Sequence, residues 1–155
     1  MPEQQKPVRP RDAASLVIYR RGTQGLEVLM GRRSDRARFK PGMYVFPGGG
    51  LEAADHRVRT TSRLDDAIVT RLAVGGSAPR AGALALAAVR ETFEETGLIV
   101  GKAGALHGPA PASWADYSKH HAAPELDKFA YVCRAITPPH RARRFDARFF
   151  FAYAE

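Results

Sequence analysis

The interpretation of this chain starts from the stretch Arg90-Glu91-Thr92-Phe93-Glu94-Glu95-Thr96-Gly97-Leu98. Glu91, Glu94 and Glu95, called the glutamate cluster below, share one face of a helix, because residues three and four apart are neighbours there. Like charges at these spacings repel by about 0.2–0.5 kcal/mol per pair. Two of the three also lie just before Gly97, a natural helix terminator, at the negative end of the helix dipole. A purely structural helix gains nothing from this arrangement.

The predicted helix spans residues 83–96, and Leu86, Val89 and Phe93 form an apolar stripe opposite the glutamate cluster. The stripe can enter a core while the carboxylates gather elsewhere. A solvated acidic face is the simplest interpretation. The alternative is a hard divalent cation, which prefers oxygen ligands and would neutralise the three carboxylates.

A glycine-rich segment, Phe46-Pro47-Gly48-Gly49-Gly50, precedes the helix and favours the cation, because glycine lets a backbone approach a ligand closely. Together the two segments resemble the Nudix box, Gly-x5-Glu-x7-Arg-Glu-U-x-Glu-Glu-x-Gly-U, in which U is aliphatic. The second half matches from Arg90 to Leu98, except that Thr92 stands at the aliphatic position. In the first half, Gly49 is separated by five residues from Asp55, a shorter substitute for glutamate.

The spacing between the two halves departs from the box. An insertion of 27 residues, roughly 56–82, separates them and carries a predicted short helix around residues 64–73. Inserted loops of this length are often lids or binding loops. An interrupted box with Asp at the first acidic position resembles a Nudix subgroup that includes coenzyme A diphosphatase-like enzymes. The insertion leaves open whether Asp55 reaches a cation through water.

A third segment resembles the coenzyme A signature of that subgroup. Leu29-Met30-Gly31-Arg32-Arg33-Ser34 is followed by Arg38, Gly42 and Phe46 at matching spacings, with Met30 and Gly31 as departures. Arginine suits phosphate recognition because it is permanently charged and bidentate. The candidate substrate-binding residues are Arg33, Arg38, Gly48, Gly49, Gly50 and Arg144. For the arginines, a solvated basic loop is the alternative.

The resemblance implies a mechanism and its residues. The glutamate cluster is expected to hold Mg²⁺ or Mn²⁺, with Glu91 and Glu95 as first choice and Glu94 as a further ligand or a base. Arg90 completes the catalytic set by pairing with Glu94. The implied reaction is hydrolysis of a nucleoside diphosphate linked to another moiety, with coenzyme A or acyl-CoA as the leading substrate. ADP-ribose, NADH, dinucleoside polyphosphates and a nucleotide-binding protein without catalysis remain alternatives.

Composition sets the outer bounds. The chain has 155 residues, a formal net charge of +8 and a single cysteine, Cys133. We expect a flexible tail over residues 1–11 and one domain over 12–155. The charge favours a small anionic substrate over nucleic acid, no apolar run is long enough for a membrane, and one cysteine suits the cytoplasm.

The predicted fold class is α/β: the Nudix fold, a mixed β-sheet packed with helices. Phe149, Phe150, Phe151 and Tyr153 place aromatic rings on both faces of the last predicted strand and need cover. A typical Nudix domain continues with another strand and a long helix, so we expect truncation, a homodimer or cover by the insertion. The predicted strands span residues 14–19, 26–30, 43–46, 98–100, 126–136 and 145–153, and a polar helix spans 114–121.

Overall fold

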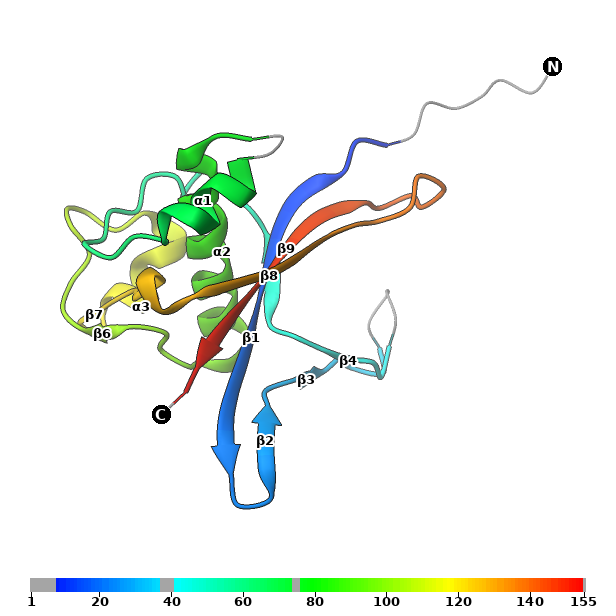
Figure 1. Ribbon diagram of the computed structural model, residues 1–155, viewed down its shortest axis with the longest axis horizontal. Helices are drawn as coiled ribbons and strands as arrows, with labels where there is room; N and C mark the ends of the chain where they lie inside the picture. The colour runs from blue at the N-terminus through cyan, green and yellow to red at the C-terminus, as the bar shows by residue number, and fades with distance from the viewer. Residues whose placement is uncertain (1–7, 37–40, 74–75, 155) are drawn as a thin grey trace.

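The computed structural model describes residues 8–36, 41–73 and 76–154, and a mixed β-sheet is its main feature (Figure 1). The sheet contains β1 (Arg11–Gly22), β2 (Gly25–Val28), β5 (Gly48–Gly50), β8 (Ala130–Ile136) and β9 (Phe145–Tyr153). The order is β2-β1-β9-β8, with β5 also pairing with β1. β1 runs parallel to β9, and the other pairings are antiparallel. Two small ribbons pair β3 (Gly31–Arg32) with β4 (Tyr44–Val45), and β6 (Lys102–Ala103) with β7 (Ala122–Ala123).

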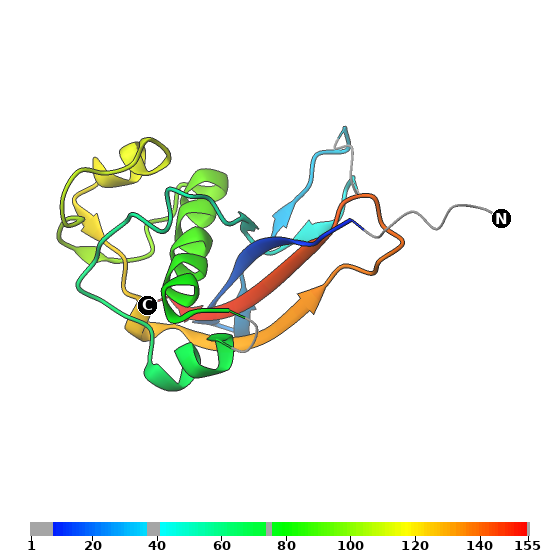
Figure 2. The same cartoon turned by 90° about the horizontal axis from the view of Figure 1, so that it is seen from above.

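The helices gather on one face of this sheet. They are α1 (Asp66–Ala73), α2 (Ala78–Thr96) and α3 (Ala115–Ser118), together with 3-10 turns at Ala112–Trp114 and Leu126–Lys128. α2 contacts β1, β5, β9 and α1. Figure 2 shows α2 between the sheet and the segment that carries β6, β7 and α3. α2 therefore lies at the centre of the molecule, with the sheet on one side and the segment of β6, β7 and α3 on the other.

The core lies where α2 crosses the parallel pair β1–β9. Leu16 of β1 stands opposite Phe150 of β9 in the register, and both are fully buried. From α2, Leu84 and Val89 are buried as well, and Phe93 packs against the same cluster. The predicted apolar stripe is thus confirmed. Burying each large aliphatic side chain contributes about 1.5–3 kcal/mol.

Several predicted boundaries differ from the structure. α2 begins at Ala78 and not at residue 83, because Pro79 suits the first turn of a helix. The predicted strand over 98–100 is wrong, since these residues follow the helix cap as irregular chain. The predicted helix over 114–121 is a 3-10 turn followed by the four residues of α3, and the predicted strand over 126–136 begins with a 3-10 turn. The predicted strand over 145–153 is confirmed as β9.

The opposite face of the sheet carries the exposed aromatic side chains of β9. Phe151 is 39% exposed and Tyr153 is 51% exposed, and both rings contact Tyr19 of β1. Arg71 of α1 lies over the ring of Tyr131, which contacts buried Phe150. The insertion therefore packs on the α2 side and does not cover the exposed rings. Cover by a second copy of the chain stays a prediction.

The mixed α/β architecture confirms the predicted fold class. Within residues 8–36, 41–73 and 76–154, α2 is the only long helix. No single helix there has the length and apolar composition needed to cross a membrane. α1 and α2 have that length and composition only when they are taken together, and the two helices are bent by 104° relative to each other.

Candidate functional site

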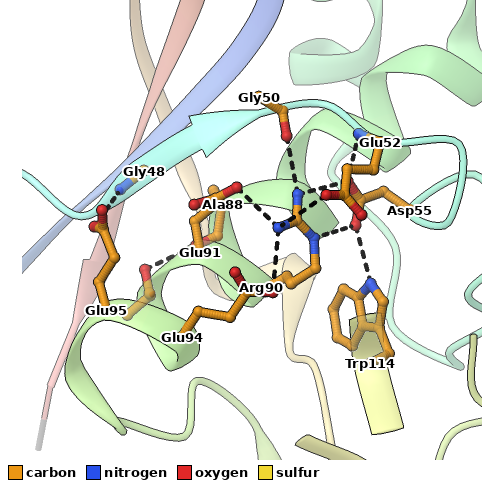
Figure 3. Close-up of polar contacts among 11 residues, drawn as sticks. Gly48, Gly50, Glu52, Asp55, Ala88, Arg90, Glu91, Glu94, Glu95 and Trp114 are labelled. Carbon is orange, nitrogen blue, oxygen red and sulfur yellow. Dashed lines mark hydrogen bonds and ion pairs between the residues drawn. The ribbon is translucent and has the colours of Figure 1, made fainter. Parts of the chain in front are cut away.

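The glutamate cluster lies on the last two turns of α2. The helix ends at Gly97, which adopts φ 74° and donates its backbone N–H to the carbonyl of Phe93 over 2.8 Å. Glycine reaches this left-handed conformation without steric cost. The sharp stop leaves Glu91 and Glu95 on the side of α2 that faces β5 (Figure 3).

The glycine strand β5 meets these two glutamates. The backbone N–H of Gly48 donates to Oε2 of Glu95 over 3.1 Å. A Cβ atom on Gly49 would lie 2.4 Å from the carboxylate of Glu91, so no larger residue fits there without a shift. The predicted loop of Gly48, Gly49 and Gly50 is thus brought against the predicted acidic residues.

Arg90 is a buried cation that is hydrogen-bonded to residues of both halves of the box. Its side chain is only 1% exposed, and its Nε and Nη2 donate to the two carboxylate oxygens of Asp55 over 2.9 and 3.1 Å. Nη2 also donates to the carbonyl of Gly50, over 2.9 Å. Nη1 donates to Glu91 over 2.8 Å and to Glu94 over 3.3 Å. Burial alone would lower the pKa of Arg90, but its bonds to Asp55 and Glu91 outweigh burial and raise the pKa above the ordinary value.

Asp55 is fully buried and its oxygens are already occupied. Oδ1 accepts from Arg90 and from Nε1 of Trp114, each over 2.9 Å, and Oδ2 accepts from Arg90 and from the backbone N–H of Glu52. The structure therefore gives Asp55 the role of an anchor for Arg90, and it does not place this carboxylate among the exposed acidic groups. Trp114 is a component of the site that the sequence motifs do not indicate.

Burial and the neighbouring carboxylates both change the pKa of Glu91. Desolvation raises the pKa of its carboxyl above the ordinary value, and although Arg90 pulls in the other direction, the charges of Glu94 and Glu95 add to the rise. A cation beside these groups would relieve both effects, since it favours the charged carboxylate.

Known proteins resemble the whole described architecture. No family model matches the chain. A crystal structure of a Nudix hydrolase from Alicyclobacillus acidocaldarius is similar with a TM-score of 0.69 and 28% identity, covering 96% of this chain and 71% of that one. A MutT/nudix family protein from Enterococcus faecalis, at a TM-score of 0.52 and 13% identity, covers 97% of this chain and 39% of that protein and shares the fold.

Curated relatives agree with the structural likeness. The acyl-coenzyme A diphosphatase NUDT19 of Gallus gallus is 32% identical over 111 residues, which is 56% of this chain and 29% of that protein. Its counterpart in Xenopus laevis is 30% identical over 99 residues, which is 50% of this chain and 26% of that protein. By fold and by sequence the chain resembles the Nudix hydrolases. It spans less than a third of the length of these two curated relatives.

In this Nudix domain the two halves of the box meet in space despite the insertion. Asp55 from the first half of the box and Arg90 from the second form a buried ion pair, although the insertion separates them in the sequence. The interruption therefore does not separate the glycine strand from the glutamate cluster.

The donor set of the Nudix site fits a hard divalent cation in its chemistry. The carboxylates of Glu91 and Glu95 lie beside the glycine strand β5, Glu94 shares their helix face, and oxygen ligands of this kind suit Mg²⁺ or Mn²⁺. Among the described residues, no group of three or more acidic, histidine or cysteine side chains is arranged closely enough to hold a metal ion as it stands.

The structure describes two of the predicted substrate arginines, Arg33 and Arg144, and their hydrogen bonds go to residues outside the glutamate cluster. Arg33 lies in the β3–β4 ribbon, where its backbone bonds to Met43, and its side chain is exposed. Arg144 donates to the carbonyls of Thr137 and Val8, over 3.0 and 2.6 Å, and so fastens the β8–β9 loop. Figures 1 and 2 place that loop at the end of the sheet away from the C-terminal end of α2. Arg38 lies outside the described residues.

Proposed function

We propose that this chain is a metal-dependent diphosphatase that cleaves a nucleoside diphosphate linked to another moiety. The observation that carries the proposal is the approach of Glu91 and Glu95 to the glycine strand β5, on a helix whose Arg90 is locked by Asp55. Backbone without Cβ atoms lets a diphosphate approach, and carboxylates beside it are the ligands that Mg²⁺ or Mn²⁺ prefers.

The residues of the chain would perform the positioning. Arg90 cannot turn freely, because Asp55 and the carbonyl of Gly50 hold its guanidinium, so its remaining N–H groups fix Glu91 and Glu94. The backbone N–H of Gly48 holds Glu95. Carboxylates fixed in advance lose little freedom on binding. A divalent cation held by Glu91, Glu94 and Glu95 would neutralise charge on the phosphoryl oxygens and lower the pKa of water.

Coenzyme A or an acyl-CoA is the substrate we favour. The two curated relatives are acyl-coenzyme A diphosphatases, and the spacing from Arg33 to Phe46 resembles the coenzyme A signature. A net charge of +8 suits an anionic substrate. ADP-ribose, NADH and dinucleoside polyphosphates are the alternative substrates, and nothing in the chemistry of the glutamate cluster distinguishes them.

A panel assay tests the substrate class. Purified chain with Mg²⁺ or Mn²⁺ is incubated with coenzyme A, an acyl-CoA, ADP-ribose, NADH and a dinucleoside polyphosphate, and nucleotide products are separated by chromatography. Cleavage of the coenzyme A compounds is expected. Cleavage of ADP-ribose alone would leave the diphosphatase intact and overturn the substrate.

A matched pair of variants tests the glutamate cluster. Glu95→Gln should lose turnover by orders of magnitude and should weaken the rise in melting temperature that Mn²⁺ causes, because binding to the folded state stabilises it. Glu27→Gln is the control, since Glu27 is an exposed residue of β2 that pairs with exposed Arg20 over 2.8 Å. Full turnover in Glu95→Gln would contradict the role of the cluster.

A Nudix-fold protein that binds a nucleotide without cleaving it is the second candidate. It predicts saturable nucleotide binding with no product across the panel. The crowding of Glu91, Glu94 and Glu95 on one helix face argues against it, because a protein that only binds a nucleotide has no need for three mutually repelling carboxylates.

A further inference from the structure

A hollow of about 770 Å³ lies where the insertion meets the N-terminal half of α2. A neighbouring hollow of about 730 Å³ shares Arg59 and His107 with it. The backbone N–H of His107 donates to the carbonyl of Arg59 over 2.9 Å, which fixes the wall between the two. None of the glutamate cluster lines either hollow. This cleft is therefore separate from the site described above.

The floor of the larger hollow is aliphatic. Four of its lining residues are buried apolar side chains that come from the insertion, from α2 and from the turn before β8: Val58, Leu64, Leu86 and Leu126. Among the described residues that line the two hollows, none is Phe, Tyr or Trp. A nucleotide base is usually held by stacking on such rings. The floor suits a flexible aliphatic chain better than a base.

The rim of the cleft is cationic. Arg59 and Arg63 line the larger hollow, Arg57 lines the smaller one, and all three are exposed. In the described part of the chain none of these three has a carboxylate partner, although Arg80, Arg90, Arg134 and Arg148 all pair with aspartate. Asp66 is the acidic residue of the lining. The positive charge of the rim is therefore left for a ligand.

We propose that this cleft is a second ligand site, which takes an aliphatic chain carrying an anionic head group. The aliphatic chain covers the floor, and a carboxylate or phosphate head pairs with Arg59 and Arg63, which bind either group in a bidentate manner. The volume lies within the usual range of small-molecule sites, about 300–1,000 Å³. The site does not depend on diphosphate hydrolysis.

Calorimetric titration of the full chain without divalent cations tests the chemistry of the ligand. Decanoate and decyl phosphate are the probes, and the tighter of the two identifies the head group. Butyrate keeps the carboxylate but lacks most of the tail, so it should bind at least about tenfold more weakly than decanoate, since each buried methylene contributes about 0.8 kcal/mol. AMP supplies a phosphate with a base in place of the tail and should bind more weakly than decyl phosphate. Saturable binding of neither decyl probe, or AMP binding as tightly as decyl phosphate, would overturn the proposal.

Charge-removing variants test the location. Arg59→Gln/Arg63→Gln should weaken the tighter probe by about tenfold or more, because charge-assisted hydrogen bonds contribute about 1.5–3 kcal/mol. Arg20→Gln/Arg21→Gln removes the same charge from the exposed end of β1 and should leave binding unchanged. Equal affinity in the wild type and in Arg59→Gln/Arg63→Gln would place the ligand elsewhere. Should that variant fail to fold, the decanoate and butyrate comparison on the wild type still decides.

Discussion

Arg90 shows how one buried charge can position a site. Asp55 neutralises the buried charge of its guanidinium. The remaining N–H groups of Arg90 donate to Glu91 and Glu94. Removing one partner of such a pair leaves an uncompensated buried charge and costs about 3–5 kcal/mol. Asp55 in turn depends on Trp114, whose indole N–H it accepts over 2.9 Å. Two residues, Asp55 and Arg90, thus link Trp114 to the glutamate cluster.

Trp114→Phe should weaken both the fold and the site. An aromatic ring is kept, but it is smaller than the indole and the N–H donor to Asp55 is lost, so the free energy of unfolding should fall by at least about 1–3 kcal/mol. Diphosphate hydrolysis should fall as well, because Arg90 then loses part of its anchor. Urea denaturation and steady-state kinetics measure the two effects.

Tyr117→Phe is the matched control. Tyr117 packs on Trp114 with ring centroids 5.2 Å apart, and its hydroxyl donates to the carbonyl of Val100 over 3.0 Å, with no link to Asp55. The variant should lose stability but keep its turnover once folded. Equal losses of turnover in both variants would show that the hydrogen bond from Trp114 to Asp55 makes no specific contribution to turnover.

The acidic groups of the site could be predicted from sequence, and their support could not. The spacing of Glu91, Glu94 and Glu95 on a helix is a local property. The bond from Trp114 to Asp55 joins residues 59 apart across the insertion, and no local pattern indicates such a pairing. The positions of Arg33 and Arg144 depend on how loops fold in space, which the motif spacing does not fix.

The two ends of α2 show how single residues determine where a helix begins and ends. The helix pattern and the strand β9 were predictable, because their apolar periodicity is strong. The start at Ala78 was missed because Pro79 reads as a break as readily as a first helical turn. The strand over 98–100 failed because these residues pair with no described strand after the left-handed turn at Gly97, and Leu98 is left 45% exposed.

Gly97→Ala should lower the free energy of unfolding by about 1 kcal/mol, because alanine is strained at the φ of 74° that the helix end requires. Gly82→Ala is the control within the same helix, where a Cβ meets nothing within 4 Å. It should stabilise the protein by about 0.5–1 kcal/mol. Urea titration compares the two; effects of the same sign would contradict the capping role of Gly97.

Gly49→Ala should abolish diphosphate hydrolysis while the protein stays folded. The added Cβ would lie 2.4 Å from the carboxylate of Glu91 and would push that side chain away from β5. Gly31→Ala in β3 is the control, since its Cβ meets nothing within 4 Å. Turnover measured beside circular dichroism separates the two outcomes, and an active Gly49→Ala protein would mean that Glu91 need not lie against the strand.

At the scale of the whole molecule, an ionic network fastens the end of the sheet to the helices. Buried Arg148 of β9 bonds to Asp12 over 3.2 Å and to Asp146 over 2.9 Å. Arg80 of α2 pairs with Asp12, and Arg134 of β8 pairs with Asp146. β1, β8, β9 and the start of α2 are therefore linked through two aspartates, at the end of the sheet away from the glutamate cluster.

Protonation of Asp146 should loosen this network at low pH. Its bonds to Arg134, and the charge of Arg148, hold the pKa of the Asp146 carboxyl below the ordinary value of 3.8. A carboxyl with a lower pKa in the folded state stabilises the fold fully above its ordinary pKa, and this contribution is lost as the pH falls through the folded value. Asp146→Asn should therefore cost about 1–3 kcal/mol near neutral pH, because Arg134 loses its charged partner while Arg148 keeps Asp12.

The difference between wild type and Asp146→Asn should shrink as the pH falls below the ordinary aspartate value, since the wild type then loses the same charge. Urea denaturation at a series of pH values measures this convergence. Asp35→Asn is the control, because Asp35 forms an exposed pair with Arg32 over 2.7 Å, and such pairs contribute at most about 1 kcal/mol. A difference for Asp146→Asn that stayed constant into strong acid would show that the aspartate acts through shape and not through charge.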